Sequence, residues 1–174
     1  MTGKTFFNGV AHDNQDILGR FLSLLEQTET QYCVIGGLAV NAYAEPVVSL
    51  DLDVIIAADQ IQAVCEQALS IGFSIETFEH SVNLAYAGSD VRIQLQTDAR
   101  YQSFLSRADI KDVLGYSMRV ASLEDVLQGK LWAYSDESRR GSKRQKDLAD
   151  ILRLAETHPD VKRLLPESIL KILV

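Results

Sequence analysis

Two aspartates, Asp51 and Asp53, stand one residue apart within the apolar stretch 50–56 (LDLDVII). Alternate residues of a β-strand point to the same face, so the two carboxylates would lie side by side, about 7 Å apart at Cα. Like charges this close repel each other unless a cation compensates them. Mg²⁺ or Mn²⁺ binds one or two carboxylates and completes its shell with water and phosphate oxygens. The pair therefore predicts a metal site for phosphoryl or nucleotidyl transfer.

A glycine pair, Gly36 and Gly37, precedes the aspartates and opens a segment of helical character, 38–44. Glycine lets a phosphate approach the backbone closely, and the first turn of a helix offers free N–H groups. Taken singly, the glycines are explained equally well by a turn, and the aspartates by a strand face open to water. Their combination in this order is more specific and favours a phosphate-binding site that serves phosphoryl or nucleotidyl transfer.

The elements that must position these residues follow from hydrophobic periodicity. Asp13 or Asn14 would cap the first helix, and Ser122 would cap a later one whose first turn is acidic. We expect helices over 13–28, 38–44, 58–73, 123–136 and 137–158, a linker or short helix over 99–108, and two short helices bracketed by Pro159 and Pro166. We expect strands over 31–37, 50–56, 74–80, 82–88, 90–97 and 117–122.

This succession predicts an α/β (α+β) chain with one mixed β-sheet flanked by helices. A length of 174 residues is that of one domain of ordinary size. We divide it into an N-terminal helix (1–30), a sheet core (31–120) and a C-terminal helical cap (121–174). The net charge of −7 argues against indiscriminate coating of nucleic acid. The one dense basic run, 139–146, is either an exposed helix end or a docking site for a polyanion.

The cysteines and the N-terminus indicate the compartment. Cys33 and Cys65 lie in apolar runs without a CxxC partner, which favours free thiols in a reducing environment. Residues 1–15 are too polar for a signal peptide, and no apolar run reaches the ~18 residues that span a membrane. We therefore expect a cytoplasmic protein without a membrane partner. The sequence leaves the oligomeric state open.

The chain resembles the nucleotidyltransferase superfamily of the polymerase-β-like fold, whose signature is hG[GS], a spacer and [DE]h[DE]h. Here IGG (35–37) and DLDV (51–54) are separated by the thirteen residues 38–50. The C-terminal half is similar to the minimal bacterial branch of AbiEii-type toxins. It shares with them a lysine-bearing helix, LQGKLWAY with Lys130, and a KDxxD element at 146–150.

The resemblance, which covers roughly residues 31–155, implies a minimal nucleotidyltransferase fold and roles for individual residues. It implies Mg²⁺ or Mn²⁺ on the two aspartates, an NTP as substrate, an RNA or protein acceptor, and an antitoxin protein as partner in a toxin–antitoxin or phage-defence system. The catalytic residues would be Asp51, Asp53, Lys130, Lys146 and Asp147, and the nucleotide-binding residues Gly36, Gly37, Ser49, Arg92 and Gln94. The alternative for Lys146, Asp147 and Asp150 is a set of solvated helix charges.

Two stretches depart from the superfamily pattern. Gln94 stands where relatives carry a third carboxylate, and glutamine cannot accept a proton as a general base. Val47 and Ser49 replace an arginine and a threonine that often precede the acidic strand, and Arg92 is placed to fill that vacancy. Three interpretations follow. The first is a Mg²⁺-dependent nucleotidyltransferase, and the second is a degenerate member that binds nucleotide or a partner without chemistry. The third is a purely structural subunit.

Overall fold

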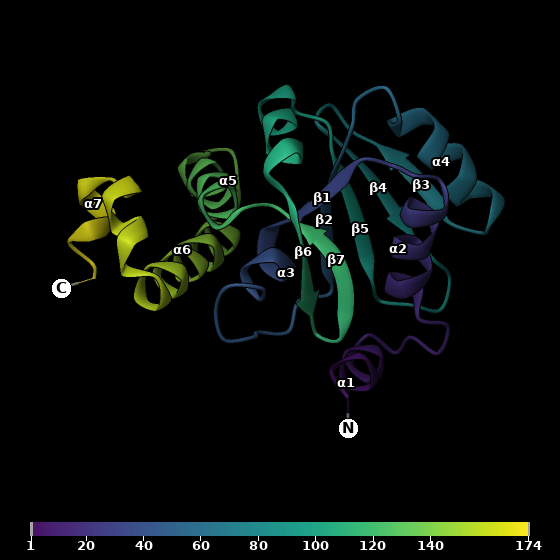
Figure 1. Ribbon diagram of the computed structural model, residues 1–174, viewed down its shortest axis with the longest axis horizontal. Coiled ribbons are helices and arrows are strands. Elements are labelled where there is room, and N and C mark those ends of the chain that lie inside the picture. The colour runs from purple at the N-terminus through teal and green to yellow at the C-terminus, as the bar shows by residue number, and fades with distance from the viewer. Residues whose placement is uncertain (1, 174) are drawn as a thin grey trace.

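The computed structural model describes residues 2–173, and its centre is a seven-stranded sheet of order β3-β4-β5-β2-β1-β7-β6 (Figure 1). The β1–β7 and β2–β5 pairs are parallel and the other pairs are antiparallel, so the sheet is mixed, as predicted. The strands are β1 (Tyr32–Ile35), β2 (Asp51–Ile56), β3 (Ser74–Thr77), β4 (Ser81–Ala85), β5 (Arg92–Gln96), β6 (Asp109–Val113) and β7 (Tyr116–Val120).

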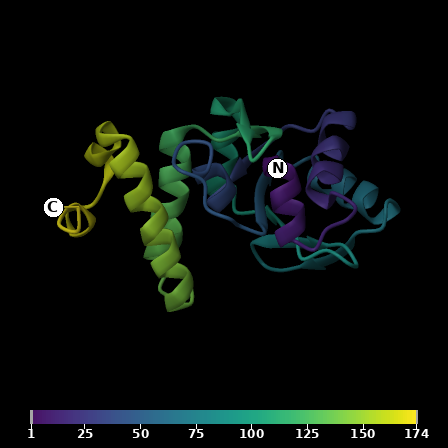
Figure 2. The same ribbon diagram turned by 90° about the horizontal axis from the view of Figure 1, so that it is seen from below.

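Helices flank this sheet and continue beyond one end of it. Figure 1 shows α2 and α4 together on one side, and both views place α5 and α6 side by side on the other, with α7 at the far end (Figure 2). The helices are α1 (Gly3–Val10), α2 (Ile17–Gln27), α3 (Gly36–Val40), α4 (Ile61–Ser70), α5 (Leu123–Ser135), α6 (Gly141–Thr157) and α7 (Glu167–Leu170), with 3₁₀ segments η1 (Ala99–Arg107) and η2 (Pro159–Leu164).

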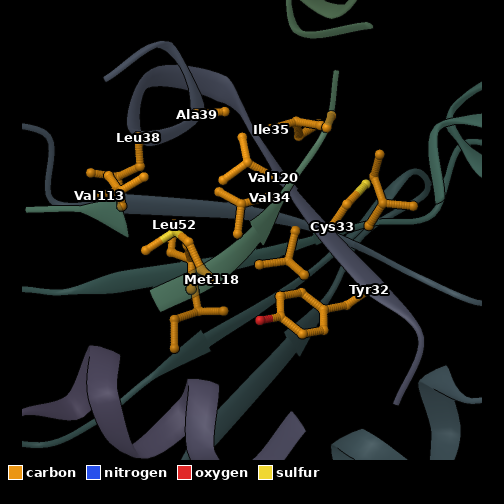
Figure 3. Packing of buried hydrophobic residues seen from close by; sticks show 14 of the residues in the cluster. Tyr32, Cys33, Val34, Ile35, Leu38, Ala39, Leu52, Val113, Met118 and Val120 are labelled. Atoms are coloured by element: carbon orange, nitrogen blue, oxygen red, sulfur yellow. The ribbon is translucent and has the colours of Figure 1, made fainter. Parts of the chain in front are cut away.

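The core lies around β1, which is buried along its whole length. Val34 pairs with Val120 of β7 on one side and Val54 of β2 on the other, and Figure 3 shows how side chains of these strands and of α3 pack together. Full burial of each such side chain contributes roughly 1.5–3 kcal/mol. The same burial raises the pKa of the Cys33 thiol to about 12, and both cysteines are free thiols.

The N-terminal region contains one helix more than was predicted. Helix α2 lies within the predicted range 13–28, whereas α1 was not predicted, and the chain turns between them through residues with positive φ at His12 and Asp16. Asp16 is the N-cap of α2, in place of Asp13 or Asn14, and its carboxylate accepts a hydrogen bond from the Gly19 N–H. Asp13 still supports this start, because its Oδ2 accepts from Ile17 N at 2.7 Å.

Two further elements differ from the expectation. The edge strand β6 was not predicted, because its mostly exposed sequence DIKDV lacks the apolar alternation of a half-buried strand. It joins β7 through Leu114 and Gly115, which both have positive φ.

Helix α3 begins at the glycine pair itself and ends at Val40. Ser122 caps α5 as predicted, with its Oγ accepting from Asp125 N at 3.2 Å. No helix within residues 2–173 has the length and apolar character needed to cross a bilayer.

Candidate active site

Strand β2 presents its two aspartates on one face of the sheet. Asp51 and Asp53 are half-buried, whereas Leu52 between them is fully buried on the opposite face. The parallel strand β5 sets Arg92 beside Asp51 and Gln94 beside Asp53. Arg92 Nε donates to Asp51 Oδ1 at 2.6 Å, so one carboxylate already has a counter-ion from the chain. The other has an uncharged neighbour.

Asp53 is the less favourably placed of the two carboxylates. Burial raises its pKa to about 6, the Lys130 ammonium opposes that shift, and the negative charge of Asp51 adds to it. A carboxylate in this state gains free energy when a cation arrives. Two carboxylates, with water and phosphate oxygens to complete the shell, fit what Mg²⁺ requires. Among residues 2–173 no cluster of three or more His, Cys, Asp or Glu forms a fuller metal cage.

The glycine pair explains how Asp53 finds its place. Gly36 has a φ of +73°, and a Cβ built on it would collide with Asp53 Oδ2. A residue with a side chain is therefore excluded by backbone conformation and by space. Gly37 faces Ser49, whose hydroxyl would lie 3.4 Å from a Cβ at that position. In the structure, the group that lies close to the Gly36 backbone is the Asp53 carboxylate.

A buried ion cluster connects α5 and α6 opposite the aspartates. Lys130 Nζ lies 3.0 Å from Asp147 Oδ1 and 2.8 Å from Asp150 Oδ2. Arg139 Nε donates to Asp147 Oδ2 at 2.7 Å, and Arg153 Nη1 donates to Asp150 Oδ1 at 2.7 Å. Burial lowers the pKa of Lys130, but the two carboxylates outweigh it and the net shift is upward. The lysine is therefore a permanent cation at neutral pH.

The sheet and the helices enclose a cleft of about 120 Å³ between these two groups. It brings together six of the predicted residues: Gly36, Asp51, Asp53, Gln94, Lys130 and Asp147. Three further wall residues are Tyr101, Arg139 and Lys143. Arg139 and Lys143 belong to the basic run 139–146, for which docking of a polyanion was one of two predicted alternatives, whereas Tyr101 was not singled out from the sequence. Lys143 lies one helical turn before Asp147, and this i, i+4 spacing places both on one face of α6.

The remaining predicted residues lie outside the cleft walls. Lys146 is exposed on α6 and does not line the cleft; the one-turn-earlier Lys143 lies there instead. Arg92 lines an adjoining groove. Gly37 and Ser49 do not line the cleft; the Ser49 hydroxyl accepts from Asp51 N at 3.4 Å and supports the start of β2. Their predicted contact with nucleotide stays a prediction.

A family model for the AbiEii nucleotidyl transferase toxins of type IV toxin–antitoxin systems matches residues 20–173. Since the match spans most of the chain, the protein belongs to the AbiEii family, and the predicted resemblance is confirmed. No curated protein sequence matches the chain.

Solved structures of nucleotidyltransferases share the fold. The lincosamide antibiotic adenylyltransferase LnuA in its lincomycin-bound form is 14% identical, with a TM-score of 0.58 over 81% of this chain and 98% of that one. ANT(2")-Ia in complex with adenylyl-2"-tobramycin is 13% identical, with a TM-score of 0.58 over 90% and 92%. An antigenic nucleotidyltransferase-like protein from Paracoccidioides brasiliensis is 17% identical, with a TM-score of 0.55 over 89% and 90%. At these identities the likeness establishes the minimal nucleotidyltransferase fold alone.

Proposed function

We propose that the protein transfers a nucleotide from an NTP to a hydroxyl-bearing RNA or protein acceptor, with Mg²⁺ held by Asp51 and Asp53. The observation that carries this proposal is the placement of the two carboxylates across a cleft from the cationic side chains of Arg139 and Lys143. Carboxylates suit the metal and cations suit the triphosphate. Bound Mg²⁺ would stabilise the charge that develops on the phosphate oxygens.

Several residues of the chain would support this reaction in different ways. Gly36 leaves room for the Asp53 carboxylate. The ion cluster contains three cations, Lys130, Arg139 and Arg153, against the two carboxylates of Asp147 and Asp150. The cluster therefore keeps a net positive charge, and Lys143 adds another at the cleft. Gln94 has no capacity to take a proton. The proton of the acceptor hydroxyl therefore leaves to an aspartate or to water.

Incubation with labelled NTPs, Mg²⁺ or Mn²⁺, and RNA or protein acceptors tests the proposal. The expected result is label on one acceptor, lost in the Asp51→Asn/Asp53→Asn double variant. Asp59→Asn is the matched control, since Asp59 is exposed just beyond β2. Transfer that survives in the double variant would contradict the assignment of the two aspartates.

A degenerate binding protein is the second candidate, and two observations favour it. Gln94 lies beside Asp53 in the sheet, and Arg92 already compensates Asp51. Calorimetry with Mg²⁺ and each NTP distinguishes the candidates when it is combined with the transfer assay. Heat of binding without transfer to any acceptor would select the degenerate protein, and no heat at all would remove both candidates. In the AbiEii setting, an antitoxin is the proposed protein partner.

A further inference from the structure

A second hollow of about 640 Å³ adjoins the cleft and runs outward over the same face of the sheet. It crosses β5, β4 and β3 and shares Asp51, Gln94 and Lys143 with the cleft. We call it the outer groove. Because the two hollows share these walls, a molecule in the outer groove would have one end at the carboxylates.

The register of the strands gives the outer groove a polar floor. Gln94, Asn83 and Glu76 are successive neighbours across β5, β4 and β3 and line the groove, and Asp53 on β2 continues the row into the cleft. The residues that alternate with them in β4 and β5 are buried on the opposite face. Adjacent strands are about 4.8 Å apart, so Glu76 lies roughly 10 Å from Gln94. The floor is thus a row of groups that can hydrogen-bond a ligand.

Asn83 lies in the middle of this row, and its side-chain oxygen lacks a hydrogen-bond donor. Its Oδ1 is buried and has no hydrogen-bond partner among residues 2–173. A buried carbonyl oxygen without a donor is unfavourable, and native structures nearly always satisfy such atoms. Since the oxygen is covered, a ligand N–H donor over β4 would satisfy it only after the Asn83 side chain turns toward the groove. Asn83 and Gln94 both carry amide groups, which pair well with the amides of a peptide backbone.

The charges along the outer groove differ between its two ends. Lys143 stands at the inner end, near the aspartates, and Glu76 is exposed at the outer end. Arg92 also lines the groove, but its Nε is bound to Asp51. An RNA strand would bring phosphates toward Glu76, where they would be repelled. A peptide with a basic side chain at that end would be attracted.

We propose that the outer groove binds a protein acceptor in extended form, with a serine or threonine hydroxyl at Asp51 and Gln94 and a lysine or arginine at Glu76. An extended chain advances about 3.3 Å per residue, so the basic residue lies about three positions from the hydroxyl residue. This inference rests on the proposed function and chooses between its two acceptors. In the reaction, the hydroxyl oxygen bonds to the α-phosphorus of the NTP. The bond from that phosphorus to the bridging oxygen breaks, pyrophosphate leaves with the electron pair, and the hydroxyl proton passes to an aspartate or to water.

Nuclear magnetic resonance titration of the ¹⁵N-labelled protein, without metal or nucleotide, tests the binding step by itself. The probe is the peptide GSGGKG, compared with GSGGQG and with the RNA trinucleotide CCA. The expected result is that GSGGKG shifts the backbone amide signals of Glu76, Asn83 and Gln94. GSGGQG should bind up to about fivefold more weakly, because it lacks the charge that pairs with the exposed Glu76.

Variants make the test specific to the outer groove. Glu76→Gln should weaken GSGGKG binding up to about fivefold and leave GSGGQG binding unchanged. Glu79→Gln is the matched control, since this exposed acid lies in the turn after β3 and outside the groove lining. Equal binding of the two peptides, or tighter binding of CCA in the groove, would overturn the proposal.

A separate titration with a non-hydrolysable NTP and Mg²⁺ distinguishes a failure of the acceptor inference from a failure of the proposed function. Signals of Gly36 and Lys143 should shift, because both line the cleft. If they shift while the peptides do not bind, the acceptor inference fails and the proposed function stands. If the nucleotide produces no shift, the proposed function fails, and the peptide result is judged on its own readout.

Discussion

The two charged groups that face each other across the cleft are built in opposite ways. In the ion cluster of α5 and α6, Lys130 is bound by both Asp147 and Asp150, and each carboxylate has an arginine as well. On β2, burial and a like charge raise the pKa of Asp53, and the neighbour beside it in the sheet is neutral. The cluster satisfies its charges internally, whereas the strand leaves one charge unsatisfied.

This difference distinguishes residues that stabilise the fold, in the ion cluster, from residues on β2 that are placed to bind a ligand. Sequence resemblance assigns the same kind of role to Lys130, Asp147 and the aspartates of β2. In the structure, Lys130 and Asp147 are occupied with each other, 7% and 1% exposed, and hold two helices together. A side chain whose charge is already compensated has little to offer a ligand, whereas a destabilised carboxylate gains from one. The contrast predicts that mutations in the two groups change stability with opposite signs.

The largest effect is expected for Lys130→Met. This substitution leaves Asp147 and Asp150 buried with fewer cations, and breaking a buried ion pair in this way costs about 3–5 kcal/mol. Urea denaturation should show the loss directly. Lys146→Met is the control, because Lys146 is exposed on α6, next to Asp147 in sequence, and its effect should stay within about 0.5 kcal/mol. Equal effects of the two substitutions would refute the structural role of the cluster.

Asp53→Asn should do the reverse. Removing a carboxylate that is unfavourably buried should raise the free energy of unfolding of the metal-free protein by about 0.5–2 kcal/mol. Nucleotide transfer should fall by about a thousandfold, because the loss of a metal ligand removes several kcal/mol of transition-state stabilisation. Denaturation and transfer assays on one preparation measure both quantities. A destabilised, fully active variant would contradict the contrast between the two groups.

Arg92→Gln should have a smaller effect, which is on metal binding at Asp51 of β2. The arginine competes with any metal for Asp51, but its side chain is 71% exposed, so the pair contributes at most about 1 kcal/mol. Removing it should tighten Mn²⁺ binding by up to about fivefold. Electron paramagnetic resonance of free Mn²⁺ measures the change. Arg100→Gln is the control, since Arg100 pairs with Asp98 instead, and weaker Mn²⁺ binding by Arg92→Gln would show that Arg92 assists the site.

The pH dependence of stability should be the finest test. The pKa of Asp53 is raised from 3.8 to about 6, so the folded state holds this proton more tightly than the unfolded state. The associated stability is present below about pH 4 and is lost as the pH rises through 6. The difference in unfolding free energy between wild type and Asp53→Asn should therefore grow between these values. A difference that stays constant with pH would show that Asp53 has an ordinary pKa.

Much of the fold could be predicted because its signals are local. Strand β1 is a continuous apolar run, β2 alternates its aspartates with buried apolar residues, and the cap of α5 at Ser122 is a residue-level signal. Strand β6 has no such signal, because an exposed edge strand does not need alternating apolar residues. The break between α1 and α2 depends on left-handed backbone at His12 and Asp16, residues whose types do not demand it.

The candidate site could be predicted in part, because its two halves differ in how they are encoded. The aspartates of β2 follow from spacing on one strand. The choice of Lys143 in place of Lys146 depends on the direction in which α6 faces the sheet, which is a property of tertiary packing. The partners of Lys130 likewise come from a different helix. Helical periodicity can place Lys143 and Asp147 on one face, but it cannot say what that face meets.

The contacts of Arg153 tie the C-terminal helices to the loop that leads into β2. Its guanidinium donates to Asp150, to Asn41 Oδ1 and to the Glu45 carbonyl, while Asn41 holds Val47 through both its amide and carbonyl groups. The loop before the aspartates is thus fastened from the far end of the chain. The Val47 amide hydrogen, which is bound to Asn41 Oδ1, should exchange more slowly than those of its exposed neighbours, and heat should unfold α6 and β2 in one cooperative transition.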